Sequence, residues 1–136
     1  MSKNILVTGS EGSLMQYVIP VLQSEGYIIT GVDNFARYGK IDRDRNYKFI
    51  KGDLTDKKFV DYIMKDIDGV VQAAALIYGV GGFHKYPADI LSKDIVLHQN
   101  ILWSMVKNEI DKIAYISSSM VYERSNNHPC KEEDAF

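Results

Sequence analysis

Two glycines stand directly after a short apolar run near the start of the chain, in the sequence LVTGSEGSLM of residues 6–15. Glycine suits a sharp turn, or a place where backbone must approach a ligand closely. If a helix begins after such a turn, its first amides favour an anion, such as the pyrophosphate of a dinucleotide. A dinucleotide-binding loop usually has a third glycine, and Met15 stands at that position here. Taken alone, Gly9 and Gly12 are equally consistent with a structural turn.

An acidic residue, Asp33, follows the next apolar run, residues 27–32. A carboxylate at the end of a second strand can accept hydrogen bonds from both ribose hydroxyls of adenosine. It would repel the 2′-phosphate of NADP, and Glu11 in the glycine loop adds the same repulsion, so the pattern favours NAD. Arg37 gives an opposing hint, because a guanidinium can pair with a phosphate. The alternative interpretation of Asp33 is a solvated loop acid.

Three further groups of small or polar residues follow later apolar runs. Asp53 could accept a hydrogen bond from the adenine amino group, or it could cap the following helix. The three alanines at 73–75 would let a flat cofactor lie against backbone, or would allow tight packing of a central strand. The three serines at 117–119 could bind a substrate hydroxyl or form a turn. The residues themselves leave each pair of alternatives open.

The composition is that of an ordinary globular protein and argues against several functional classes. The 136 residues fit one domain, with 46% hydrophobic and 25% charged residues. A net charge of −2 gives no attraction to nucleic acid or to an anionic membrane. No apolar run approaches the roughly 20 residues of a membrane span, and the first residues lack a signal-peptide pattern, so we expect a cytoplasmic protein. Cys130 is the only cysteine, and neither it nor the histidines show metal-ligand spacing.

Alternating strand and helix patterns must position the candidate residues. Apolar runs predict strands over residues 4–7, 27–32, 47–51, 70–75 and 112–118. Helical spacing predicts helices over residues 12–24 and 57–65, and a longer helix from Pro87 past Met105. We expect Pro20 to bend or break the first helix, and Thr55 or Asp56 to cap the second. Residues 78–86 should form a loop, and the tail over 123–136 should carry no regular element.

This alternation predicts an α/β fold, a doubly wound parallel sheet with helices on both faces. The expected strand order is 3-2-1-4-5, as in Rossmann-like folds, with the ligand crevice at the carboxyl edge near the first strand. Each candidate, from Gly9 to the serines at 117–119, lies at or close to the carboxyl end of a predicted strand. The topology therefore predicts that most of them meet at one edge of the sheet.

In this order and at these spacings, the motifs resemble the extended short-chain dehydrogenase/reductase family. The motifs are Thr8-Gly9-x-x-Gly12, Asp33, Asp53-Leu54, Ala73-Ala74-Ala75, Asn100 and Ser117-Ser118-Ser119-x-Val121-Tyr122, within residues 4–125. The family includes NAD-dependent nucleotide-sugar epimerases and dehydratases. Residues 79–89 are also similar, more weakly, to the branch of GDP-fucose synthase and GDP-mannose 3,5-epimerase.

The resemblance implies a role for each matching residue. NAD would be the cofactor and a nucleotide sugar the substrate, with hydride transfer to and from a sugar carbon. Ser118 would be catalytic and would hydrogen-bond the hydroxyl that is oxidised. No metal is implied. The implied cofactor-binding residues are Gly9, Gly12, Ser13, Leu14, Asp33, Asn34, Asp53, Leu54, Ala73, Ala74, Ala75, Asn100 and Ser117.

The largest departure from the family pattern concerns the catalytic tyrosine. In the family it belongs to a Tyr-x-x-x-Lys pair on a helix, as general acid/base. Here Tyr47 and Lys51 have that spacing but fall on a predicted strand, where such side chains lie about 13 Å apart. The resemblance implies that the family's Tyr-x-x-x-Lys helix would begin after Phe136. We therefore expect residues 1–136 to be a truncated dinucleotide-binding domain, lacking the substrate domain, that binds NAD without turnover. The surface left uncovered on the long helix should favour a homo-oligomer.

Two other functions stay possible for the chain, and three further residues depart from the family pattern. The chain could be a non-catalytic NAD-binding module, or part of an NADPH-dependent sugar-nucleotide reductase. Gln72 stands where the family often has histidine, and Met120 stands where the 3,5-epimerase branch has a reactive cysteine. Met15, in place of the third glycine, should displace or rotate the first helix and weaken NAD affinity without abolishing binding.

Overall fold

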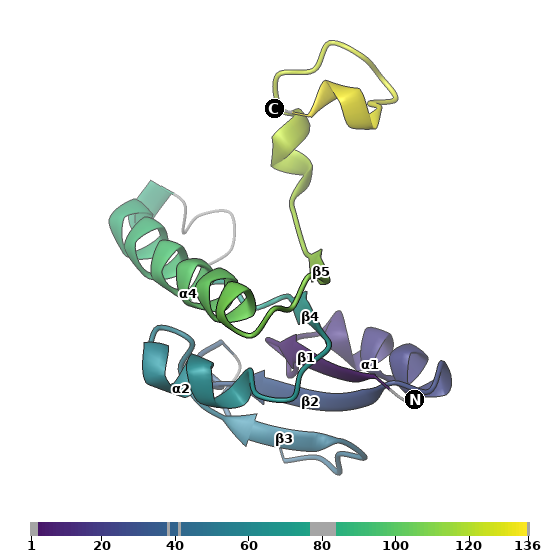
Figure 1. The fold of residues 1–136 in the computed structure, drawn as a ribbon. Helices are drawn as coiled ribbons and strands as arrows, with labels where there is room; N and C mark the ends of the chain where they lie inside the picture. The colour runs from purple at the N-terminus through teal and green to yellow at the C-terminus, as the bar shows by residue number, and fades with distance from the viewer. Residues whose placement is uncertain (1–2, 38, 41, 77–83, 136) are drawn as a thin grey trace.

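The computed structural model describes residues 3–37, 39–40, 42–76 and 84–135. In these residues five parallel strands form one sheet in the order β3-β2-β1-β4-β5 (Figure 1). The strands are β1 (Asn4–Thr8), β2 (Ile28–Asp33), β3 (Lys48–Lys51), β4 (Gly69–Gln72) and β5 (Ile113–Tyr115). The predicted doubly wound sheet and its strand order are confirmed.

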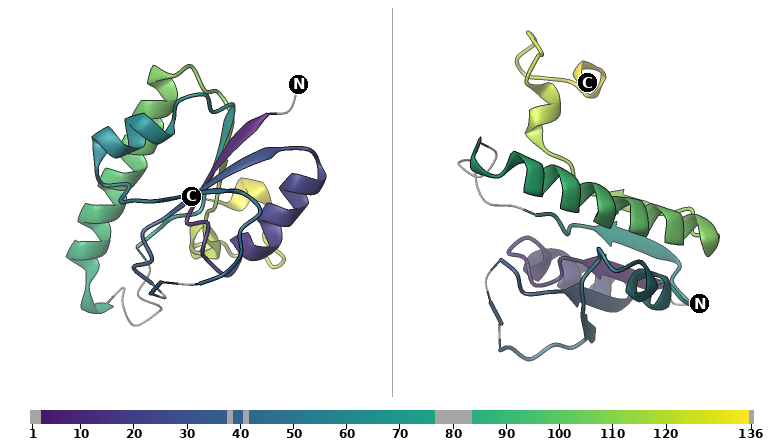
Figure 2. Two further views of the ribbon diagram at one scale, coloured as in Figure 1. Left: turned by 90° about the horizontal axis from the view of Figure 1, so that it is seen from below. Right: turned by 90° about the vertical axis from the view of Figure 1, so that its left-hand side faces the viewer.

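Helices cover both faces of this sheet. They are α1 (Met15–Ser24), α2 (Lys57–Ile63) and α4 (Pro87–Lys107). Figure 2 shows α1 on one face and both α2 and α4 on the other. Asp56 is the N-cap of α2, because its carboxylate accepts hydrogen bonds from the amides of Lys58 and Phe59. This confirms one of the two predicted caps and rules out Asp53 as the cap.

The two faces of the sheet bury two separate apolar clusters. Side chains of a strand point alternately to opposite faces, and β1 shows this directly: Leu6 packs in a cluster with residues of α2 and α4, such as Ile101. Its neighbour Val7 packs in the other cluster, with Met15 and Ile19 of α1. Strand β1 is therefore buried on both sides, as a central strand of a parallel sheet must be.

Two strands end earlier than the apolar runs predicted. Strand β4 stops at Gln72 rather than at Ala75, and β5 stops at Tyr115 rather than at Ser118. The cause at β4 is a side chain, because the Thr8 hydroxyl accepts hydrogen bonds from the amides of Ala73 and Ala74, both at 3.1 Å. These amides therefore turn away from the strand ladder and toward the carboxyl end of β1.

The proline in the first helix does not break it. Helix α1 runs from Met15 to Ser24 with Pro20 inside. Of the predicted bend or break, the break is therefore wrong, and the bend stays a prediction. An interior proline removes the hydrogen bond to the carbonyl four residues earlier, which here belongs to Gln16. Both Gln16 and Pro20 are exposed, so water can satisfy that carbonyl and the helix tolerates the loss.

Replacing this proline should stabilise the protein. In Pro20→Ala we expect the free energy of unfolding to rise by about 1–3 kcal/mol, because alanine restores the hydrogen bond and the best helix propensity. Urea unfolding with an unchanged m-value would measure the gain. Gln16→Ala, an exposed position on the same helix, should change stability by less than about 0.5 kcal/mol. A loss of stability in Pro20→Ala would show that the proline is needed to place α1.

The chain after β5 runs away from the sheet (Figure 1). It contains two 3-10 turns, η1 (Ser119–Tyr122) and η2 (Glu132–Asp134). The second turn corrects the prediction of an irregular tail, since the Lys131 amide donates to the Asp134 carboxylate at 2.8 Å and closes the turn. The predicted loop over 78–86 lies mostly outside the described residues, and its residues 84–85 are helical. Within the described part of the chain, no helix has both the length and the hydropathy needed to cross a membrane.

Candidate functional site

A cavity of about 860 Å³ opens at the carboxyl edge of the sheet, where β1, β2, β3 and β4 end. This volume lies in the range of small-molecule and cofactor sites. All of the cofactor-binding residues implied by the sequence line it, except Asn100 and Ser117. The lining residues among them are Gly9, Gly12, Ser13, Leu14, Asp33, Asn34, Asp53, Leu54, Ala73, Ala74 and Ala75.

The glycine loop is held against the end of β4 by close backbone packing. Gly9 has a φ of +64°, and a Cβ placed there would lie 2.9 Å from the Ala74 amide nitrogen. The Gly12 amide donates to the Gly9 carbonyl at 2.9 Å and closes the turn. The first glycine is therefore required by both its dihedral angle and its contact with residues 73–74.

Helix α1 presents its first turn to the cavity without a side-chain cap. Leu14 occupies the N-cap, and its side chain has no oxygen that could accept from the first amides of the helix. Its carbonyl accepts from the amides of Tyr17 at 3.1 Å and Val18 at 3.2 Å. Met15, at the position of the missing third glycine, is 1% exposed and packs with Val7 and Val71. Methionine thus serves as a core side chain there, and its effect on NAD affinity stays a prediction.

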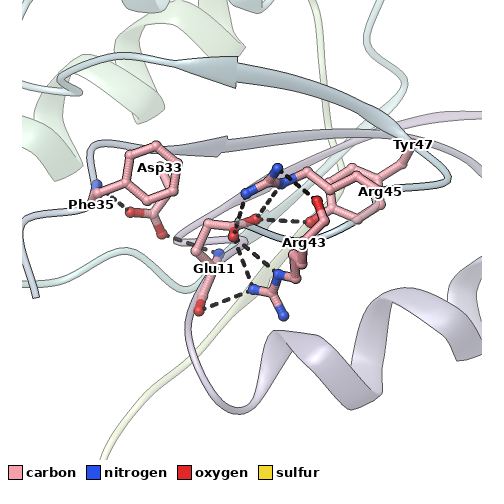
Figure 3. Close-up of polar contacts among 6 residues, drawn as sticks. All are labelled: Glu11, Asp33, Phe35, Arg43, Arg45 and Tyr47. Carbon is pink, nitrogen blue, oxygen red and sulfur yellow. Dashed lines mark hydrogen bonds and ion pairs between the residues drawn. The ribbon is translucent and has the colours of Figure 1, made fainter. Parts of the chain in front are cut away.

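Asp33 is anchored at the rim of the cavity by two backbone amides. One carboxylate oxygen accepts from the Glu11 amide at 3.1 Å, and the other accepts from the Phe35 amide at 2.8 Å (Figure 3). A carboxylate can accept about four hydrogen bonds, so each oxygen keeps capacity for a further donor. Asp33 is therefore not a freely solvated loop acid, and its orientation is fixed toward the cavity.

The side chain of Glu11 lies in a cluster that the sequence did not reveal. Its carboxylate is 2% exposed and accepts hydrogen bonds from Arg43 at 3.0 and 3.1 Å, from Arg45 at 2.9 and 3.1 Å, and from the Tyr47 hydroxyl at 3.1 Å (Figure 3). Burial alone raises the pKa of Glu11, but these hydrogen bonds outweigh burial and hold the pKa below its ordinary value. Two guanidiniums pair with the Glu11 carboxylate, and its expected repulsion of a 2′-phosphate stays a prediction.

The residues after β3 form a turn that α4 holds in place. Asp53 accepts from the amide and the hydroxyl of Thr55, both at 2.9 Å, so its carboxylate shapes the turn at the cavity wall. Asn100 of α4 donates to the carbonyls of Leu54 and Thr55, both at 3.0 Å. Asn100 therefore supports the wall from behind and does not line the cavity.

The serines after β5 lie outside the cavity lining. Ser117 and Ser118 are exposed, and the Ser118 hydroxyl accepts from the Met120 amide at 3.2 Å as the N-cap of η1. Only Ile116 of this segment reaches the cavity. Ser118 therefore forms a turn in this structure, and its role toward a substrate stays a prediction.

A chain of hydrogen bonds crosses from β1 to β5 below the cavity. Gln72 accepts from the Thr8 hydroxyl at 2.7 Å, and its amide nitrogen lies 2.9 Å from the Ala74 carbonyl and 3.2 Å from His98 Nδ1. His98 Nε2 lies 3.0 Å from the Tyr115 hydroxyl. Since the amide of Gln72 donates, His98 Nδ1 must accept, which assigns a neutral imidazole with its proton on Nε2.

This assignment makes stability depend on pH. Burial lowers the pKa of His98 below its ordinary value of 6.5. The unfolded chain therefore binds a proton near pH 6.5 while folded His98 stays neutral, so the free energy of unfolding should fall as pH drops below about 6.5. Urea unfolding at pH 7.5 and 5.5 measures this loss, which should shrink in His98→Gln and persist in His128→Gln, a change in the exposed tail. An equal loss in all three proteins would contradict the assignment.

Several lining residues were not anticipated from the sequence. They come from the loop after β2, from the first half of α4 and from the ends of β3, β4 and β5: Phe35, Ala36, Gly39, Thr55, Leu76, Ser92, Lys93, Val96 and Ile116. A loop has no hydrophobic periodicity, so its sequence does not indicate which of its side chains face the cavity. The amphipathic pattern of α4 did indicate Leu97, which is 8% exposed and belongs to the core.

Comparison with known proteins shows the family of this chain. The model of the NAD dependent epimerase/dehydratase family matches residues 5–136. The chain belongs to this family. The resemblance to NAD-dependent nucleotide-sugar epimerases is thereby confirmed, with NAD as the cofactor of the family.

Individual members of the epimerase/dehydratase family match nearly the whole chain. It is 29% identical over 143 residues to UDP-glucose 4-epimerase 3 of Oryza sativa subsp. japonica, a match over 96% of this chain and 38% of that protein. The solved UDP-glucose 4-epimerase from Bifidobacterium longum, in complex with NAD+ and UDP, is 26% identical with a TM-score of 0.84, over 96% of this chain and 42% of that one. GDP-L-fucose synthase of Escherichia coli is 29% identical over 68 residues, 50% of this chain and 21% of that protein. The chain thus spans about two fifths of the relatives it matches over its whole length.

Proposed function

We propose that residues 1–136 form a dinucleotide-binding domain that binds NAD at the carboxyl edge of the sheet, as the N-terminal part of a nucleotide-sugar epimerase or dehydratase. The observation that carries this proposal is the cavity itself. Residues named from the sequence, at four separate strand ends, line one space of cofactor size. The bound UDP and NAD+ of the Bifidobacterium longum relative support the same substrate class.

The residues present fit a dinucleotide. The uncapped amides at the start of α1 and the glycine turn would bind the pyrophosphate. Asp33 would accept from the adenosine ribose hydroxyls with the capacity left beside its two backbone donors. Asp53 and Leu54 would contact adenine, and residues 73–75 would lie against the cofactor. Bound NAD would supply the hydride acceptor for oxidation of a sugar carbon.

Two residues outside the cavity lining would also contribute. We assign Asn100 a positioning role, because it holds the carbonyls of Leu54 and Thr55 that shape the adenine wall. Ser118 would hydrogen-bond the sugar hydroxyl as the proton is removed. It lies two residues after Ile116 of the cavity lining, and its hydroxyl would have to leave its place as the N-cap of η1 to reach the crevice.

Calorimetric titration of the 136-residue chain with NAD tests the proposal. We expect one binding site per chain, and binding that is lost when a bulky side chain fills the cavity, as in Ala74→Trp. The same chain with NAD and UDP-glucose should give no sustained product. Absence of NAD binding would overturn the proposal, while sustained turnover would overturn the claim that catalysis needs more than these residues.

Self-association belongs to the same proposal. Helix α4 exposes Trp103 and Val106, which are 66% and 70% exposed, and β5 leaves Ile113 and Tyr115 exposed. Apolar surface of this extent tends to find a partner. Sedimentation velocity should show a concentration-dependent dimer or larger species, which Trp103→Glu shifts toward the monomer. A sharply monomeric chain at all concentrations would contradict this.

A further inference from the structure

The cluster of Glu11, Arg43, Arg45 and Tyr47 connects the glycine loop to the segment before β3. One buried carboxylate receives two guanidiniums and a phenol hydroxyl, and the Arg43 Nη2 also donates to the Glu11 carbonyl at 3.3 Å (Figure 3). Two guanidiniums pair with one carboxylate, and Arg45 also donates to the Arg43 carbonyl at 3.1 Å and lies over the Phe49 ring at 4.5 Å. Arginine is the side chain best suited to bind a phosphate, because its planar fork matches two oxygens at once.

In the proposed function, this cluster would lie beside the group by which NAD and NADP differ, because Glu11 also contacts Asp33. The two cofactors differ by a phosphate on the 2′-hydroxyl of the adenosine ribose, the group that Asp33 would bind. The amide of Glu11 donates to Asp33, while the carboxylate of Glu11 holds both arginines. Glu11 therefore connects Asp33 to two guanidiniums that do not themselves line the cavity.

We propose that Glu11 is a specificity-determining residue, which keeps Arg43 and Arg45 in ion pairs and so denies them to the 2′-phosphate of NADP. This inference rests on the proposed function. Glu11 acts by positioning other groups and makes no contact with the reacting atoms. Its carboxylate is covered and neutralised, so simple repulsion of a phosphate is not its main effect.

The two ways in which Glu11 could oppose NADP give different predictions for the arginines. If Glu11 acted by direct repulsion, removing its charge would admit NADP whether or not the arginines were present. If Glu11 acts by holding the arginines, NADP binding gained in Glu11→Gln must disappear when Arg43 and Arg45 are also removed. A triple variant therefore separates the two mechanisms.

Calorimetric titration of the whole chain with NAD and with NADP is the test. In Glu11→Gln we expect the ratio of NADP to NAD affinity to rise about tenfold or more, since a guanidinium that gains a phosphate forms a charge-assisted hydrogen bond. In Glu11→Gln/Arg43→Ala/Arg45→Ala the ratio should return toward that of the unchanged protein. Glu25→Gln removes one negative charge at the far, exposed end of α1 and should leave the ratio unchanged.

Each outcome bears on the proposal. An unchanged ratio in folded Glu11→Gln, or a raised ratio that survives in the triple variant, would overturn it. If Glu11→Gln fails to fold, Glu11→Asp keeps the charge but is too short to span both guanidiniums, and its ratio should rise by a smaller factor. An unchanged ratio in Glu11→Asp would then overturn the inference. A starting protein that binds neither dinucleotide would instead overturn the proposed function.

Discussion

Gly9→Ala should lower the free energy of unfolding by about 2–5 kcal/mol and abolish measurable NAD binding. Two costs add at this position. An alanine with φ near +64° is strained, and its Cβ would lie 2.9 to 3.0 Å from backbone atoms of residues 73–74, which cannot rotate away as a flexible side chain can. Either the turn or the end of β4 must shift, and both border the cavity. Urea unfolding and calorimetry with NAD measure the two effects.

Gly26→Ala is the matched control for this prediction. Gly26 also has a positive φ, of +85°, but a Cβ there would meet nothing within 4 Å. This variant should therefore show only the cost of the left-handed conformation, about 1–2 kcal/mol, and should bind NAD normally. Equal losses in the two variants would mean that the dihedral angle alone matters, and that the packing of Gly9 on residues 73–74 does not.

Asp33→Asn should weaken NAD binding by about tenfold to a hundredfold, the loss expected when a hydrogen bond to a charged acceptor is weakened. The asparagine side chain keeps one accepting oxygen, while its amide nitrogen would face the amide of Glu11 or of Phe35. The rim of the cavity would therefore lose part of its order as well as the charge that favours ribose hydroxyls. Calorimetry with NAD measures the change.

Asp111→Asn serves as the control for Asp33→Asn. Asp111 is exposed and lies just before β5, at the amino edge of the sheet and away from the cavity. The Asp111→Asn substitution removes the same charge as Asp33→Asn and should leave NAD affinity unchanged. If Asp33→Asn bound NAD as tightly as the control, the ribose site would have to lie elsewhere in the crevice.

Much of the cavity wall could be anticipated because it follows from topology. Parallel strands bring their carboxyl ends to one edge, so residues that follow four different apolar runs had to meet once the strand order was right. Gly9, Asp33, Asp53 and Ala74 were all placed at this edge in that way, and all line the cavity. The serines after β5 were placed at this edge by the same rule, but they do not line the cavity. The chain runs away from the sheet after β5 (Figure 1).

The details of local structure were less predictable because side chains far apart in the sequence decide them. The Thr8 hydroxyl ends β4 by taking two amides out of the ladder. Solvent exposure on one side of α1 lets Pro20 stay inside a continuous helix. In both cases the apolar run or the proline was recognised in the sequence. The end of the strand and the continuity of the helix depended on a long-range contact or on solvent exposure, which no local pattern contains.

The amino-acid sequence by itself determined the order of strands and helices, the faces they bury and the family to which the chain belongs. These depend on periodicity and on motifs within short windows, where each residue acts through its neighbours in the chain. Only the tertiary structure decided what surrounds each polar group. From the sequence, Glu11 was an acid in the glycine loop that would repel a 2′-phosphate. Folding buries it against Arg43, Arg45 and Tyr47, which no local pattern indicated. Burying a charge is costly unless it is paired. The partners of the Glu11 carboxylate come from the irregular segment before β3, and no hydrophobic periodicity there predicts that they pack against it.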